Sequence, residues 1–267
     1  MGYPSWHFIF NTSHLNNIEM AAHDKHPSSN IPVELTEQWS AIDEYAMSHL
    51  HPMNRNNNAT VQTSLETTLA ATKEEKMPLG NVSPAWGKFL TLQARAIKAK
   101  HMLEVGTLAG YSAIWMATQV PGLNLDTIEF LPKHAEVAQR NINAAGVANQ
   151  VTIHQGAALD VLAVFEKEII EGKRERFEFV FIDADKMNSA AYFDYAVTLS
   201  KPGSIIIVDN VMGRFGVSVA EEDPQEEHAK GGKLAIEAVG KDTRVDATVM
   251  QFVGAKGYDG YLLALVL

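Results

Sequence analysis

The sequence predicts a doubly wound α/β fold with a mostly parallel, seven-stranded sheet, an antiparallel C-terminal hairpin and helices ahead of the sheet. Beyond Lys100, strand-like apolar segments alternate with helical segments, which favours parallel pairing because parallel neighbours need long crossover connections. The run FVFI at residues 179–182 is unbroken, as in a strand that is buried on both faces. Two final strand-like segments are separated only by GAKGYDG, which indicates a hairpin.

The segment before the first strand is predicted to be helical. Helical spacing of apolar residues is expected over residues 33–50, 61–72 and 84–98, with Ser83 as the cap of the third helix and Pro84 at its first position. Because these helices precede every strand, we expect them to form a lid or an interface layer. Residues 1–32 are predicted to be a flexible N-terminal extension, and residues 33–267 a single domain with N-terminal helices (33–98) and a Rossmann-like core (99–267).

Within the core, strands and helices are expected to alternate. The parallel strands are predicted at residues 101–106, 123–130, 150–156, 177–185 and 204–210, and the helices at 110–119, 132–145, 157–171, 189–200 and 226–240. The hairpin is predicted to pair residues 244–253 with 261–267 through a turn at 254–260.

The composition restricts the possible partners and location. The net charge is −10, from 32 acidic and 22 basic residues, which disfavours nucleic acid because phosphate backbones require clustered lysine and arginine. The chain has no cysteine, so disulfides and thiolate metal sites are excluded. No apolar run approaches the about 18 residues that a membrane span requires, and no basic leader is recognised. We therefore expect a cytoplasmic protein without a membrane or nucleic-acid partner.

The first predicted strand ends in LEVGTLAGYSA, residues 103–113, whose two glycines allow a tight turn and close approach of a ligand. Gly106 and Gly110 have the spacing G-x-x-x-G, which differs from the G-x-G-x-x-G of dinucleotide sites. Glu104 would repel a phosphate but suits a cation, and Glu129 ends the next strand, where an acid can bind ribose hydroxyls. A cationic nucleoside without phosphate is S-adenosylmethionine. Alternatively, the glycines only form a turn and Glu129 is solvated.

Two later strands end in oxygen ligands. FVFIDADK places Asp183 and Lys186 after one strand, and SIIIVDN places Asp209 and Asn210 after the next. Neighbouring parallel strands would bring these oxygens to one edge, in a set that suits Mg²⁺. Lys186 would lie close enough to take a proton from a metal-bound hydroxyl. The alternative is that the acids only cap turns and Lys186 is a surface partner.

These motifs resemble those of the cation-dependent O-methyltransferases that include catechol and caffeoyl-CoA O-methyltransferases. The resemblance rests on LEVGTLAGYSA, TIEFLPKHAEVA, FVFIDADKMNSAAYFDYA and IIIVDNVMG, and extends from about Met77 to Leu267. It implies the class I methyltransferase fold, a homodimer, and Mg²⁺-dependent methyl transfer from S-adenosylmethionine, which leaves S-adenosylhomocysteine. The expected acceptor is a small vicinal dihydroxy aromatic such as a phenylpropanoid or flavonoid.

The resemblance also implies roles for individual residues. Lys186 would be the general base, and a divalent cation, Mg²⁺ or another, would be held by Asp183, Asp209 and Asn210. The cofactor would be bound by Val82, Glu104, Gly106, Ser112, Glu129, Ala158, Asp183 and Asp185. Leu131 departs from the family pattern, which has Asp or Asn there, and residues 33–76 and 211–224, including Arg214 and Phe215, would shape the acceptor pocket. An NAD-dependent dehydrogenase and a catalytically idle S-adenosylmethionine-binding protein are the alternatives.

Overall fold

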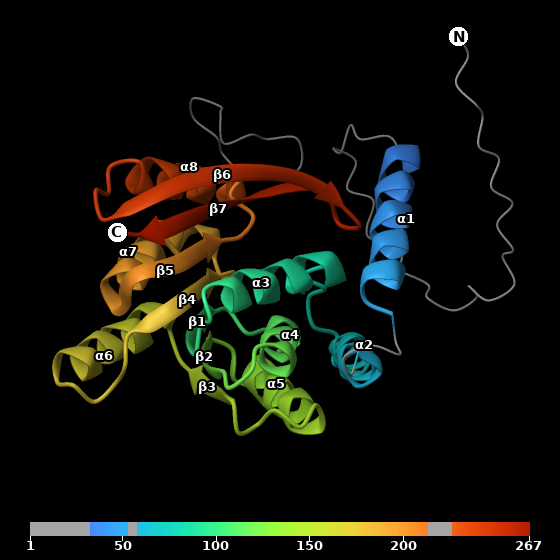
Figure 1. Cartoon of the computed structure of the whole chain (residues 1–267), viewed down its shortest axis with the longest axis horizontal. Coiled ribbons are helices and arrows are strands. Elements are labelled where there is room, and N and C mark those ends of the chain that lie inside the picture. The colour runs from blue at the N-terminus through green and yellow to red at the C-terminus, as the bar shows by residue number, and fades with distance from the viewer. Residues whose placement is uncertain (1–32, 53–57, 213–225) are drawn as a thin grey trace, which may run out of the picture.

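The computed structural model describes residues 33–52, 58–212 and 226–267 (Figure 1). In this part of the chain, seven strands form one sheet in the order β3-β2-β1-β4-β5-β7-β6. The predicted fold class is therefore confirmed. The expected extension over residues 1–32 lies outside the described residues, and the proposed domain boundaries stay a prediction.

The sheet places the ends of its central strands side by side. Its parallel strands are β1 (His101–Val105), β2 (Asn124–Glu129), β3 (Val151–Gln155), β4 (Phe177–Ile182) and β5 (Ser200–Val208). The strands β6 (Val245–Gly254) and β7 (Gly257–Val266) form an antiparallel hairpin, and β7 pairs with β5. As the sequence predicts, β4 and β5 are neighbours, so the residues that follow them meet at one edge.

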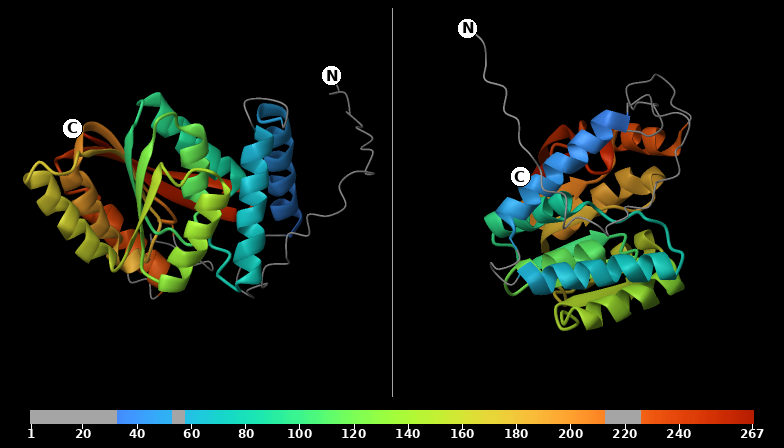
Figure 2. Two further views of the ribbon diagram at one scale, coloured as in Figure 1. Left: turned by 90° about the horizontal axis from the view of Figure 1, so that it is seen from below. Right: turned by 90° about the vertical axis from the view of Figure 1, so that its right-hand side faces the viewer.

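Helices cover both faces of the sheet (Figures 1 and 2). One face packs on α3 (Pro84–Ala96), α4 (Tyr111–Gln119) and α5 (Pro132–Ala144), and the other on α6 (Ala158–Ile170), α7 (Ser189–Leu199) and α8 (Glu227–Val239). Successive strand residues alternate between the two apolar layers: Met102 and Phe179 belong to the first, Leu103 and Val180 to the second. Burial on both faces explains why these strands are continuous apolar runs.

Two N-terminal helices form an outer layer beyond α3–α5 (Figure 2). They are α1 (Val33–Leu50) and α2 (Asn58–Glu74), and α2 begins three residues before the predicted residue 61. The Asp43 carboxylate of α1 accepts a hydrogen bond from Ala255 N of the hairpin turn at 2.8 Å. In the described ranges, no helix is long and apolar enough to cross a membrane.

The hairpin turn is tighter than the sequence predicts. Instead of a loop over residues 254–260, Gly254 pairs with Gly257, so only Ala255 and Lys256 lie between the strands. Gly257 has φ of +95°, which residues with a side chain rarely adopt. This backbone conformation allows the chain to reverse direction within a two-residue turn. As a result Asp259 belongs to β7 and reaches the sheet edge at Asn210.

Candidate active site

A cavity of about 640 Å³ lies at the carboxyl ends of the parallel strands. This is where ligands of open α/β sheets bind. The loops after β1, β2, β3, β4 and β5 form its wall, together with residues 80–82 ahead of α3. The predicted site residues that line this cavity are Val82, Gly106, Ser112, Glu129, Ala158, Asp183, Asp185, Lys186 and Asn210.

Glu104 lies behind the cavity wall and is fully buried. Its carboxylate accepts hydrogen bonds from the hydroxyls of Ser112 and Thr127, the latter at 2.6 Å. Burial raises the pKa of Glu104 to about 7, despite these two hydrogen bonds. A buried carboxylate surrounded by neutral hydroxyls fits a ligand with a positive group. Sequence reasoning missed Thr127, whose position opposite Glu104 depends on the β1–β2 register.

Glu129 holds two loops at the cavity wall. One carboxylate oxygen accepts from Leu108 N at 2.8 Å, and the other from Leu131 N at 2.9 Å. A carboxylate accepts about four hydrogen bonds, so capacity for ribose hydroxyls remains. Leu131, the departure from the family pattern, stands at the N-cap of α5 without a side-chain cap bond and lines the cavity.

Gly106 is required for a reason that the sequence did not show, in addition to the predicted turn and close approach of a ligand. A Cβ at this position would lie 2.1 Å from the carbonyl oxygen of Asp183, which follows the neighbouring strand. Its φ is +102°, which also excludes most side chains. The backbone of β1 and the segment after β4 are joined here, because Asp183 N donates to Val105 O at 2.8 Å. Gly106 therefore fixes the position of a predicted metal ligand.

The predicted metal ligands come from adjacent strand ends. Asp183 and Asn210 line the cavity, whereas Asp209 is only 4% exposed behind it. Burial, followed by the charge of Asp183, raises the pKa of Asp209 to about 7. In the described part of the chain, no three His, Cys, Asp or Glu side chains gather as a metal site, so the set depends on two carboxylates and one amide. Such oxygen donors fit Mg²⁺.

The predicted metal ligands are held by two residues that the sequence analysis did not identify. Trp86 Nε1 donates to Asp209 Oδ2 at 3.0 Å, and Asn210 Nδ2 donates to Asp259 Oδ2 at 2.5 Å. The second contact leaves the amide oxygen of Asn210 as its available ligand atom. Asn210 has φ of +55°, a conformation that asparagine tolerates better than most residues. These partners are 123 and 49 residues away, so local patterns could not reveal them.

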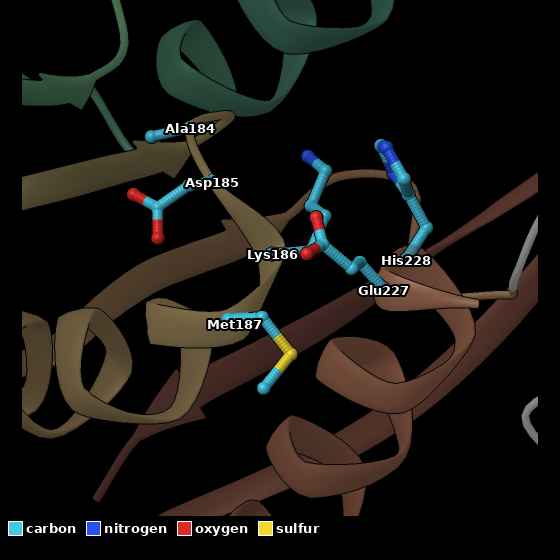
Figure 3. Close-up of a pocket in the computed structure, with 6 residues that line it drawn as sticks. All are labelled: Ala184, Asp185, Lys186, Met187, Glu227 and His228. Atoms are coloured by element: carbon cyan, nitrogen blue, oxygen red, sulfur yellow. The ribbon is translucent and has the colours of Figure 1, made fainter. Parts of the chain in front are cut away.

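Lys186 is 7% exposed, and its Nζ lies 2.8 Å from Asp183 Oδ1. It begins the 3₁₀ turn Lys186–Asn188, against which α8 packs closely: a Cβ on Gly231 would lie 2.3 Å from Lys186 O. A second cavity of about 420 Å³ adjoins this turn (Figure 3). In Figure 3, the side chains of Lys186 and His228 point to the same side. Lys186, the predicted base, therefore lies beside the predicted metal ligand Asp183, and the packing of α8 fixes its backbone.

Asp185 is held by neighbours in its own segment. Its carboxylate accepts from the hydroxyl of Tyr192 and from Asn188 Nδ2, the latter at 2.6 Å. Burial and the charge of Asp185 raise the pKa of Tyr192. Of the predicted acceptor segment, Arg214 and Phe215 lie outside the described residues.

Comparisons with known proteins identify the class. The O-methyltransferase family model matches residues 55–265. An O-methyltransferase, imqG, of Aspergillus flavus is 44% identical over 231 residues, which are 85% of this chain and 91% of that protein. A catechol O-methyltransferase of Niastella koreensis is 46% identical over 205 residues, 75% of this chain and 90% of its own.

Solved structures agree with the sequence relatives. The O-methyltransferase of Bacillus cereus in complex with SAH has a TM-score of 0.78 and 39% identity, and covers 87% of this chain and 100% of its own. The O-methyltransferase TomG of Streptomyces achromogenes, in complex with SAM, has a TM-score of 0.76 and 37% identity, with coverages of 86% and 98%.

The chain belongs to the O-methyltransferase family. The resemblance found in the sequence is confirmed, as is the enzyme class, an S-adenosylmethionine-dependent O-methyltransferase of the catechol and caffeoyl-CoA type. The dehydrogenase alternative is set aside.

Proposed function

We propose that this enzyme is a Mg²⁺-dependent O-methyltransferase that methylates one hydroxyl of a small vicinal dihydroxy aromatic such as a phenylpropanoid or flavonoid. The observation that carries the proposal is the arrangement after β4 and β5: two carboxylates, an amide and a lysine lie together beside the cavity. Oxygen donors favour a hard cation, which neighbouring hydroxyls of one aromatic ring can chelate. Relatives named catechol O-methyltransferase support this acceptor class.

The methyl donor would bind along the other strand ends. Glu104 offers a buried negative charge without a cationic partner among its hydrogen bonds, which suits the positive groups of S-adenosylmethionine. Glu129 would bind the ribose, and Ala158 and Val82, which also line the cavity, would contact the remaining cofactor surface.

The residues divide the chemistry between them. Bound Mg²⁺ would supply Lewis acidity to an acceptor hydroxyl, and Asp183, Asp209 and Asn210 would hold it. Lys186 Nζ lies beside Asp183 within the same cavity and, in its neutral amine form, would receive the proton. S-adenosylmethionine would supply the methyl group: the acceptor oxygen would gain a bond to the methyl carbon as the carbon–sulfur bond breaks, which would leave S-adenosylhomocysteine. The buried walls orient the reactants, and orientation supplies a large part of the rate.

Methyl transfer to a panel of catechols, flavonoids and caffeoyl-CoA tests the proposal, with Mg²⁺ and again with EDTA. We expect product with vicinal dihydroxy acceptors that disappears in EDTA, and a large loss of turnover in Asp183→Asn. Product that persists in EDTA would exclude the metal-dependent mechanism. Binding of S-adenosylhomocysteine without turnover of any acceptor would favour the idle binding protein.

We also propose that the enzyme is a cytoplasmic homodimer without a nucleic-acid partner. Support for the dimer comes from α1, where Ile42 is 58% and Tyr45 is 63% exposed, and from the adjoining hairpin, where Met250 and Val253 are about half exposed. Apolar side chains on neighbouring elements are typical of interfaces. Sedimentation equilibrium should give twice the chain mass, and Ile42→Glu should shift the population towards monomer. A monomeric wild type would refute the dimer.

A further inference from the structure

Trp86 occupies a closely packed position at the start of α3. Its backbone N–H donates to the Ser83 cap at 3.2 Å, and the residue is 8% exposed. The indole stacks on Phe89 and Phe252, with ring centroids 4.9 and 5.2 Å away, and meets Tyr261 at 4.5 Å. Aromatic rings from α3 and from both hairpin strands therefore fix the plane of the indole.

The polar edge of this ring points at a carboxylate. Trp86 Nε1 donates to Asp209 Oδ2 at 3.0 Å, and the other oxygen accepts from Asn210 N at 2.9 Å. Asp209 is 4% exposed, so a lost hydrogen bond could not easily be replaced by bulk water. With one donor on each oxygen, the carboxylate is held in one rotamer, and its remaining lone pairs have fixed directions.

We propose that Trp86 is a positioning residue for the divalent cation: its indole N–H orients the Asp209 carboxylate for metal binding. This inference rests on the proposed metal-dependent function and adds a residue from outside the ligand-bearing strand ends. Partners that orient a metal ligand commonly change metal affinity by about 10- to 100-fold when they are removed. The packing cluster on α3 and the hairpin would thus set the geometry of the metal site.

Trp86→Phe tests the inference because it keeps an aromatic ring and removes the N–H. We would titrate Mn²⁺ into the full-length protein, follow free Mn²⁺ by electron paramagnetic resonance, and measure S-adenosylhomocysteine binding by calorimetry. The expected result is a Mn²⁺ Kd raised by about 10-fold or more, with little change in the S-adenosylhomocysteine Kd. Trp115→Phe, at a buried tryptophan of α4, is the matched control and should leave the Mn²⁺ Kd unchanged.

The possible outcomes distinguish failure of the Trp86 inference from failure of the proposed metal-dependent function. Wild-type Mn²⁺ affinity in Trp86→Phe, with binding lost in Asp209→Asn, would overturn the role of Trp86 and leave the metal site standing. If the wild-type protein binds no Mn²⁺, the metal-dependent function is overturned, and the inference falls with it. The same holds if the Asp209→Asn variant binds Mn²⁺ as well as the wild type does.

A measurement on the unmodified protein covers the case in which Trp86→Phe does not fold. Mg²⁺ should shift the ¹⁵N–¹H resonance of the Trp86 indole, assigned by elimination with Phe variants of the other tryptophans, because its acceptor gains a cation. The Trp115 indole should not shift. A Trp86 resonance that is insensitive to saturating Mg²⁺ would overturn the proposal.

Discussion

Replacing Glu104 with glutamine should raise the free energy of unfolding of the ligand-free enzyme. The same replacement should weaken the binding of S-adenosylmethionine. The side chain is fully buried, and burial raises its pKa from the usual 4.5 to about 7. Because the folded enzyme binds this proton more tightly than the unfolded chain, the wild-type free energy of unfolding falls as the pH rises above about 4.5 and levels off above about 7. The difference between the two pKa values corresponds to about 3 kcal/mol at pH 8.

Glutamine removes the ionisation and keeps the shape. The Ser112 and Thr127 hydroxyls can still pair with it, since a hydroxyl both donates and accepts. Urea unfolding of both proteins from pH 5 to pH 8 should therefore show the variant gaining stability relative to wild type. Measured from its value at pH 5, the expected gain is about 1 kcal/mol by pH 6 and about 2.5 kcal/mol by pH 8.

Cofactor binding should change in the opposite direction. A cationic ligand favours the ionised carboxylate, so the wild-type Kd for S-adenosylmethionine should rise about tenfold for each pH unit below about 7. In Glu104→Gln, calorimetry should give a weaker Kd with no such slope. Glu44→Gln, at an exposed acid on α1, is the control and should match wild type in both assays. Equal pH profiles for Glu104→Gln and wild type would refute the reasoning.

Three further variants test the supports of the site and the core. Asp259→Asn weakens the contact that orients the amide ligand, so Mn²⁺ affinity should fall by about tenfold; an unchanged titration would contradict this. Gly231→Ala should lower turnover but not cofactor affinity, because its Cβ would lie 2.3 Å from Lys186 O. It should also destabilise by about 1–3 kcal/mol in urea, opposite to the usual helix preference for alanine. Leu90→Ala, fully buried, should cost about 2–5 kcal/mol, whereas the half-exposed Leu92→Ala should cost much less.

The predictions from the sequence succeeded where local patterns carry the information. A buried parallel strand needs a continuous apolar run, and the polar residues that follow it must lie at the carboxyl edge, whatever the rest of the fold. Asp183 and Asn210 could therefore be assigned to one edge from the strand pattern alone, and both line the cavity. The turn at residues 254–260 was misjudged because strand ends depend on cross-strand pairing, and local turn residues do not define it.

By itself, then, the sequence determined the order of the helices and strands, the family, and the polar side chains that follow the strands. Each of these depends on short contiguous segments of the chain. Tertiary structure alone decided which side chains support that chemistry. Trp86 reaches Asp209 across 123 residues of chain, and Gly106 is required by the backbone of a neighbouring strand. Such contacts arise from the packing of helices and strands against one another. Packing depends on the whole fold, so no local pattern encodes it.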